Sequence, residues 1–447
     1  MRIRLDKSVV FALLLLATCG ALAQDPEIES LRTAIDELRA DYEARISELE
    51  RRLAVAEQNA SQASVAAQQS AAPVATTGSS ANSAFNPAIG VIFQGYAWHY
   101  GEDPEGYAVP GFPFGGEAGP IPQGLSIGET EINISANVDD KFTAWLTTPV
   151  VIEDGEAKIE IEEAWIATTA LPGGFSAKFG RFYSGIAYLN SKHSHEWDFA
   201  DQPLPYKAFL GGQYLDDGVQ LRWIAPANLY MEFGAEVLQG SRYPAAGSGN
   251  SGHGSYSLFA NIGGDVGAGN SWLAGISYLD ASATDRPSGD EDDPLIFNGD
   301  SNLVSAHLVW KWSPRGNWKQ KNLIIQTEFL WRNEDGEYTL PGSPALAYDN
   351  DQLGWYVQAI YQPFPRWRFG GRVDGLSSDD PGPLFDGTLL AAPSSDPMRY
   401  SLMADWSNSE FSRLRLQYTK DNAGLVSDYQ WGLQYIHSIG AHGAHSF

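Results

Sequence analysis

The sequence predicts an all-β protein, a transmembrane antiparallel β-barrel of about 16 strands preceded by an N-terminal α-helical coiled coil. Apolar and polar residues alternate with period two from about residue 86 onward. The connections between these alternating runs are short at one end and mostly long at the other. The chain has 14 Trp, 20 Tyr and 20 Phe, yet it contains no run of about 20 apolar residues that could form a membrane-spanning helix.

The N-terminus predicts export. A basic stretch, an apolar run over residues 9–17 and the small residues Ala21 and Ala23 are typical of a secretory signal peptide over residues 1–23. Cleavage there removes Cys19, which is the only cysteine. The mature chain is therefore expected to have no disulfide, no cysteine metal ligand and no thiol nucleophile.

The sequence pattern predicts a periplasmic coiled coil over residues 24–58 and a flexible linker over residues 59–85. Apolar residues recur every three or four positions in the first segment, with charged residues on the other faces. So narrow a seam buries little surface in one copy, so we expect a homo-oligomer, a trimer in particular; a frayed amphipathic tail is the alternative. The linker is almost entirely Ala, Ser, Gln and Thr.

Residues 86–447 predict the barrel. In the strand after Ala227, for example, Leu229, Met231 and Phe233 share one face, whereas Glu232 and Glu236 share the other. A soluble sandwich would show the same alternation with its apolar faces inward; Trp and Tyr near the strand ends favour a lipid-facing girdle instead. Predicted strands begin near Ile89, Leu125, Phe142, Lys158, Phe175, Gly218, Leu229, Ser255, Ser271, Asn302, Asn322, Gln352, Arg366, Met398, Phe411 and Asp428.

The connections predict an orientation in the bacterial outer membrane. Short turns are typical of the periplasmic end of such barrels and long loops of the outer end, and segments 284–301 and 333–351 are among the expected long loops. An even strand count places both termini in the periplasm. A C-terminal Phe447 resembles the signal read by the barrel assembly machinery. The expected surroundings are outer-membrane lipid and lipopolysaccharide, with peptidoglycan within reach of the coiled coil.

The longest connection, residues 184–217, is expected to fold into the lumen and narrow it. A barrel of this size leaves an aqueous passage, and this loop carries more apolar residues than a solvated loop would. A loop packed over the barrel mouth or in a subunit interface is the alternative. The residues predicted at the constriction are Lys192, His193, His195, Glu196, Asp198 and Asp201.

Inward-facing charges are expected to divide by sign into two walls, which would set a transverse field across the pore. Equally, these side chains could pair with their neighbours and only fill the wall. The predicted acidic wall is Glu129, Glu131, Glu160, Glu162 and Glu232, and the predicted basic wall is Arg368, Arg372, Arg399, Arg413 and Arg415.

His193 and His195 also suggest a metal site, since imidazoles and carboxylates suit zinc or copper; a structural role is the alternative, and His442 and His445 add two further imidazoles. The chain has no H-E-x-x-H motif, and the mature chain is expected to have no cysteine nucleophile, so we expect neither an enzyme nor a cofactor. A net charge of −26 argues against nucleic-acid binding.

Residues 180–214 and the Gly-Ala-His-Gly-Ala-His segment at 440–445 resemble a group of proteobacterial outer-membrane proteins, some labelled zinc-regulated TonB-dependent outer membrane receptors. More broadly the chain is similar to the phosphate-selective porin superfamily, which pairs a coiled coil with a trimeric sixteen-stranded barrel. That family uses a lysine cluster, whereas this loop has only Lys192 and Lys207. A plugged receptor needs about 22 strands and a plug domain, for which this chain has no room.

The resemblance and the residue pattern together predict a porin for passive diffusion of small hydrophilic, charged solutes. The alternatives are a metal-linked uptake receptor and a structural outer-membrane anchor tethered through the coiled coil.

Overall fold

The computed structural model describes residues 87–153, 156–169, 171–246, 253–290 and 292–440. The predicted signal peptide, coiled coil and linker, together with His442, His445 and Phe447, lie outside these ranges. Among the described residues, no helix is long and apolar enough to cross a bilayer.

The described chain is almost entirely β-structure, with one short α-helix, α3 (Leu204–Leu210), and four single-turn 3₁₀ segments. The strands are β1 (Ala88–His99), β2 (Gly124–Ile127), β3 (Thr130–Asn137), β4 (Phe142–Glu153), β5 (Glu156–Ile159), β6 (Glu163–Thr168), β7 (Phe175–Tyr183), β8 (Leu215–Ile224), β9 (Tyr230–Leu238), β10 (Ser255–Val266), β11 (Asn270–Ser288), β12 (Leu295–Trp312), β13 (Asn322–Thr339), β14 (Ala345–Phe364), β15 (Trp367–Ser378), β16 (Met398–Ser409), β17 (Ser412–Asp421) and β18 (Asp428–Gly440).

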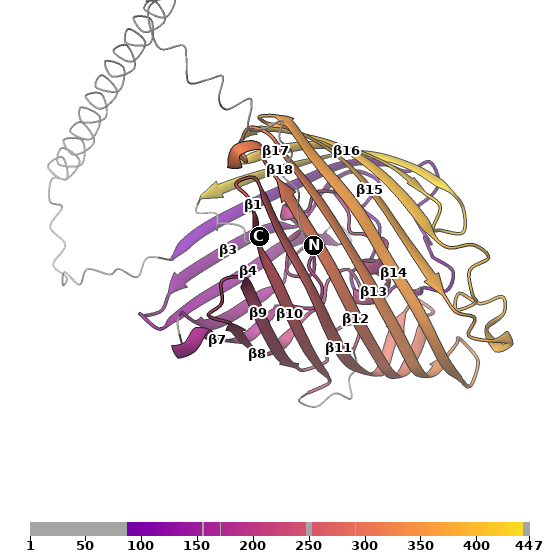
Figure 1. Cartoon of the computed structure of the whole chain (residues 1–447). Helices are drawn as coiled ribbons and strands as arrows, with labels where there is room; N and C mark the ends of the chain where they lie inside the picture. Colours follow the sequence, from indigo (N-terminus) through magenta and orange to yellow (C-terminus); the bar gives the residue numbers. More distant parts are fainter. Residues whose placement is uncertain (1–86, 154–155, 170, 247–252, 291, 441–447) are drawn as a thin grey trace, which may run out of the picture. The chain divides into compact units, whose positions relative to one another are not determined.

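These segments form one closed antiparallel barrel of sixteen strands (Figure 1). All eighteen described segments belong to one sheet, and β1 pairs with β18 to close it. Two of these strands are interrupted and consist of two segments each. Segments β2 and β3 both pair with β1, and segments β5 and β6 both pair with β4. The predicted barrel of about sixteen strands is therefore confirmed. Closure removes every exposed strand edge, as lipid requires.

Alternation along each strand gives the barrel an apolar exterior and a polar interior. On β9, Phe233 and Val237 are exposed on the outside, whereas Glu232 and Glu236 are buried on the inside. On β13, Phe329 points outward and Glu328 is fully buried. A side-chain period of two produces this division on every regular strand. The apolar side chains are thus not packed against one another, as they would be in a sandwich.

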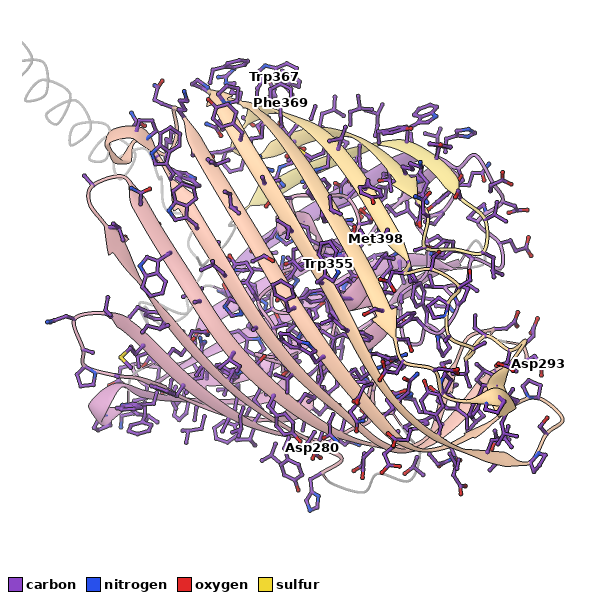
Figure 2. All side chains as sticks on the ribbon, turned by 45° about the vertical axis from the view of Figure 1, so that its right-hand side comes forward. Asp280, Asp293, Trp355, Trp367, Phe369 and Met398 are labelled. Carbon is purple, nitrogen blue, oxygen red and sulfur yellow. The ribbon has the colours of Figure 1, made fainter. Side chains whose placement is uncertain are left out.

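Aromatic residues mark two levels on the outer surface (Figure 2). Trp367 and Phe369 lie at the end of the barrel that carries the short turns, and Trp355 lies farther along the wall. Trp355 and Phe364 are nine residues apart on β14. Nine residues span roughly 30 Å along a strand, and a tilt of about 35–45° reduces this to roughly 21–25 Å, close to the height of a lipid-facing band.

Strands β11 to β14 continue well beyond this band. They are 18 to 20 residues long, and β12 and β14 each begin seven residues before their predicted starts. The expected loops at 284–301 and 333–351 were therefore wrong: most of these residues are paired strands. The inward apolar residues of this extension, including Phe297 and Tyr338, pack against a loop segment containing Phe385 and Leu390. That local core explains why polar-looking segments stay in strand conformation.

The main apolar core lies inside the barrel. It is built from the connection between β7 and β8, including α3, packed against inward residues of β11 to β15. Leu279, Leu303, Leu330, Tyr356 and Leu376 supply this apolar stretch of wall. One side of the lumen is thus a docking surface for α3 and not a wetted wall.

Gly354 lets α3 approach β14, because a Cβ at this position would lie 2.6 Å from Pro205 Cβ and 2.8 Å from Phe209 Cε2. We expect Gly354→Ala to force the helix away and to cost about 1–3 kcal/mol of stability, measured as a lower melting temperature in detergent. Gly371→Ala is the matched control, since its Cβ would meet only Leu402, at 3.6 Å. Equal melting temperatures for the two variants would refute the close-packing account.

Candidate functional site: a lumen crossed by one loop

The segment between β7 and β8, residues 184–214, lies inside the barrel; hereafter we call it the inner loop. Its backbone and side chains bond to Gln94 on β1, Glu131 on β3, Glu236 on β9, Glu328 on β13 and Gln417 on β17. These strands are spread around the whole ring. Only a segment within the lumen can contact them all.

Buried carboxylates on the wall bind the backbone of the inner loop. Glu236 accepts the N–H of Gly185 at 2.8 Å, and Glu328 accepts the N–H groups of Tyr188 and Leu189 at 2.8 and 3.2 Å. Backbone donors inside a barrel have no strand partner, so a carboxyl oxygen of the wall replaces the missing ladder bond. These contacts fix the path of the first half of the loop.

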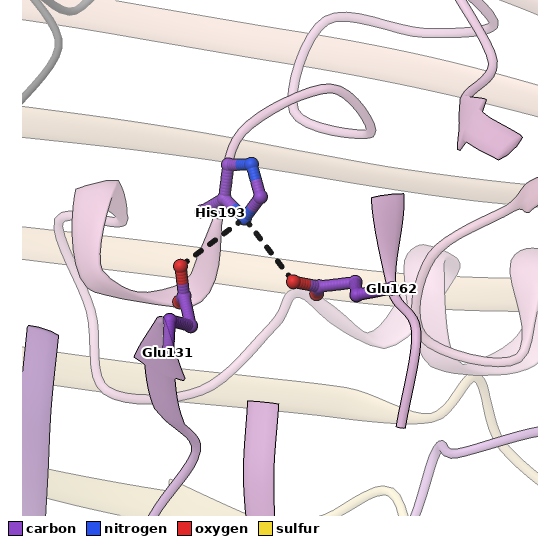
Figure 3. A group of neighbouring side chains, drawn as sticks. All are labelled: Glu131, Glu162 and His193. Carbon is purple, nitrogen blue, oxygen red and sulfur yellow. Dashed lines mark ion pairs between the residues drawn. The ribbon is translucent and has the colours of Figure 1, made fainter. Parts of the chain in front are cut away.

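Carboxylates and histidines gather where the inner loop meets β3 and the β5–β6 junction (Figure 3). His193 Nδ1 lies 3.5 Å from both Glu131 Oε2 and Glu162 Oε2, and His193 Nε2 lies 3.1 Å from Glu163 Oε2. His195 Nδ1 lies 2.9 Å from Glu131 Oε1. Burial disfavours the imidazolium, but the nearby carboxylates of Glu131, Glu162 and Glu163 outweigh it and hold the pKa of His193 well above its usual value. We call these five residues the acidic cluster.

The break between β5 and β6 explains why neighbouring residues face the same histidine. In an unbroken strand Glu162 and Glu163 would point to opposite sides of the wall. Here β5 ends at Ile159 and β6 begins at Glu163. The irregular junction lets both carboxylates face the lumen, so the interruption builds the cluster.

On another part of the wall, arginines of β15 to β17 hold the middle of the inner loop. Asp201 accepts a hydrogen bond from Arg372 at 3.0 Å and forms an ion pair with Arg399 at 2.9 Å. Burial opposes ionisation of Asp201, but Arg399 and Arg372 outweigh it and hold the pKa of this carboxyl far below its usual value. Arg415 donates to the carbonyl of Trp197 at 2.6 Å. Each arginine thus bonds a loop group.

Two cavities flank the inner loop. One, of about 430 Å³, lies at the end of the barrel with the long loops and is lined by Glu117, Glu129 and Lys207 among others. The other, of about 510 Å³, lies toward the short turns and is lined by Lys178, Lys192 and other residues. Tyr183 lines both. The hydroxyl of Tyr183 donates to Glu162, so the boundary between the cavities adjoins the acidic cluster.

The predicted constriction residues all lie on the inner loop, and the structure distributes them between its two sides. Lys192, His193, His195 and Asp201 are buried. Asp198 pairs with Arg368 at 2.8 Å. Of the predicted acidic wall, Glu131 and Glu232 are fully buried and Glu160 is exposed at the strand interruption. The remaining predicted acids, Glu129 and Glu162, both border the inner loop, whose Glu196 lies in the turn Ser194–Glu196.

The arginines of the predicted basic wall lie inside the barrel, but most of them are buried in ion pairs and hydrogen bonds. Arg372, Arg399 and Arg415 have at most 3% exposed side chains, whereas Arg368 and Arg413 keep 18% and 26%. Of these five arginines, only Arg368 and Arg413 keep an appreciable part of the side chain exposed.

Sequence reasoning missed several of the anchoring acids. Glu163 was overlooked because regular alternation from Glu162 would place it outward. Asp374 and Asp405 lie on inward positions beside the predicted arginines, and they pair with Arg399 at 2.8 Å and Arg415 at 2.9 Å. The alternation on β15 and β16 would have identified both.

A closed sixteen-stranded barrel with an apolar exterior and one long loop folded into its lumen defines a porin-type fold. An uncharacterised protein of Aquifex aeolicus (strain VF5) is 32% identical over 349 residues, which cover 73% of this chain and 70% of that protein. The chain therefore belongs to the same family as that protein. No family model matches the chain.

A solved structure of an outer membrane channel supports the fold. The outer membrane channel DcaP of Acinetobacter baumannii superposes with a TM-score of 0.51 at 13% identity, covering 81% of this chain and 100% of that one. An anion-selective porin from Comamonas acidovorans gives a TM-score of 0.48 at 9% identity, covering 79% of this chain and 100% of that one.

Asp201 tests how the inner loop is held. Asp201→Asn leaves Arg372 and Arg399 buried without this counter-charge, so we expect a loss of about 3 kcal/mol and faster proteolysis within residues 184–214. Asp349→Asn is the control, because Asp349 is exposed on β14 and makes the same change in charge. Wild-type stability and protease resistance in Asp201→Asn would show that the arginines need no partner from the loop.

Proposed function

We propose that this protein is an outer-membrane channel through which small hydrophilic solutes, including charged ones, diffuse passively. The observation that supports it is a closed ring with an apolar exterior and a lumen that keeps water-sized space on both sides of the inner loop. Because one water needs only about 10–15 Å³ of such space, cavities of about 430 and 510 Å³ each have room for several water molecules. An interior built only as an anchor would have no need for such space.

The expected solutes are small because the inner loop contacts walls all around the lumen. Solutes would pass the boundary at Tyr183, beside charges of both signs. Phosphate selectivity is not part of the proposal, because Lys192 and Lys207 line different cavities and form no cluster. The shared fold with DcaP, which is described as an outer membrane channel, supports the class of function.

The same proposal includes a homotrimer in a lipid and lipopolysaccharide environment, inserted by the barrel assembly machinery. The wall is interrupted where the short segments β2 and β5, with four residues each, are separated from β3 and β6, and Leu125 and Ile159 on these segments are among its most exposed apolar side chains. A second copy of the barrel would cover this interrupted, apolar side better than lipid alone.

Planar-bilayer recording with purified full-length protein tests the channel. We expect stable ohmic steps of small amplitude, because the inner loop leaves only narrow space. Asp201→Asn should give larger or noisier steps, since it loosens the loop. A silent but folded and membrane-inserted protein would contradict the proposal and favour the structural anchor.

Arg413 tests charge selectivity. Its guanidinium is partly exposed, and its hydrogen bonds to the carbonyls of His195 and Trp197 are long, at 3.4 Å each. We expect Arg413→Gln to shift the zero-current potential in a salt gradient toward cation preference, because a positive charge leaves the lumen. Arg366→Gln removes the same charge from an exposed turn and should change little. Equal shifts for both variants would rule out a local field.

A further inference from the structure

The acidic cluster has an unusual division between bonded and unbonded atoms. Each of three side chains has one polar atom, here called the outer atom, that is hydrogen-bonded. Glu131 Oε1 is bonded to His195, Glu162 Oε1 accepts from Tyr183, and His193 Nε2 is bonded to Glu163. The inner atoms, Glu131 Oε2, Glu162 Oε2 and His193 Nδ1, have no hydrogen-bond partner although they are buried. These three atoms lie within 4.8 Å of one another.

The geometry points to a site for a divalent transition-metal cation with the ligand preferences of Zn²⁺, held by Glu131, Glu162 and His193 (Figure 3). Ligands about 2.1 Å from a tetrahedral zinc are separated from one another by roughly 3.4 Å. The Nδ1 of His193 lies 3.5 Å from each of the two inner carboxylate oxygens. These two ligand–ligand distances therefore match the edges of a coordination shell, and the third, between the two carboxylate oxygens, is at most 4.8 Å.

The same spacing is poor for the simpler arrangement, an imidazolium held by two carboxylates. An N–H···O hydrogen bond closes to about 2.7–3.2 Å, and His193 Nε2 does reach Glu163 at 3.1 Å. Nδ1 stays 3.5 Å from both Glu131 and Glu162 instead of approaching either. The side chain of Glu131 is completely buried, so leaving its Oε2 unpaired is costly unless something else binds it.

The surrounding contacts suit a metal ligand set. A ligating imidazole usually donates its other N–H to a carboxylate, which orients the ring and fixes the tautomer. Glu163 is placed for this role at Nε2. His195 and Tyr183 hold the outer oxygens of the two carboxylates. Three protein ligands of nitrogen and oxygen type leave one tetrahedral position for water.

The ligands come from three parts of the chain. Glu131 lies on β3, Glu162 at the β5–β6 junction and His193 on the inner loop. A bound cation would therefore cross-link the loop to the wall where the two cavities meet, and it would neutralise part of a dense group of carboxylates. The site stands on geometry alone and does not depend on the channel proposal.

Zinc binding to the full-length protein in detergent, stripped with chelator and then dialysed against Zn²⁺, tests the site. We expect about one Zn²⁺ per chain in the wild type and none in Glu162→Gln or His193→Asn. Glu163→Gln should weaken binding by about 10–100-fold, as loss of an orienting partner does. His307→Asn, on β12 among residues lining the turn-side cavity, should bind as the wild type does.

Two further measurements separate metal loss from misfolding. Zn²⁺ should raise the melting temperature of the wild type but not of Glu162→Gln, which keeps a partner for Tyr183. Co²⁺ should give the intense visible absorption of a tetrahedral site only where His193 is present. Absence of stoichiometric binding in folded wild type, or equal binding by Glu162→Gln, would overturn the inference. Conductance is a separate readout, so the channel could fail while the metal site holds, and the reverse.

Discussion

The structure depends on satisfying the polar backbone of a loop inside a closed barrel. The described wall strands use their N–H and C=O groups in the sheet, so the wall meets the inner loop mainly through side chains, and other backbone groups of the loop bond within the loop itself. Glu236, Glu328 and Asp374 meet this need by accepting backbone N–H groups of Gly185, Tyr188 and Leu204. Without such acceptors the loop would keep its donors in water outside the lumen.

Charge complementarity then decides where each half of the loop lies. The wall that carries Glu131 and Glu163 receives the histidines, and the wall that carries Arg372 and Arg399 receives Asp201. The charges that attract a solute and the charges that hold the loop are therefore largely different residues. A count of inward charges overstates the field that a solute would meet.

Much of the fold follows from alternation, which the sequence displays directly. The strand order, the inward position of Glu232 and the outward position of Phe233 needed nothing beyond a period of two. Local departures from regular alternation could not be predicted from the period of two. The β5–β6 interruption puts Glu162 and Glu163 on one side, and the extension over residues 333–351 depends on packing against a distant loop segment. Both are tertiary effects without a local signal.

The candidate site was harder to predict than the fold because it is defined by the carboxylates that surround His193 and His195, which are distant in sequence. The His193 and His195 pair was visible, but its spacing alone suits structural as well as metal-binding roles. What distinguishes them is the position of carboxylates that are 30 to 64 residues away in sequence. Such pairs become neighbours only through the register of the closed barrel.

A loop held on all sides cannot swing aside as a rigid lid. Opening it would break ion pairs at Asp201, hydrogen bonds at Glu328 and the apolar contacts of α3 in one step. In the proposed channel, control of passage would therefore lie in smaller movements at the boundary of the two cavities, where Tyr183 and the acidic cluster meet. The same residues that make the lumen narrow thus also determine what could change its width.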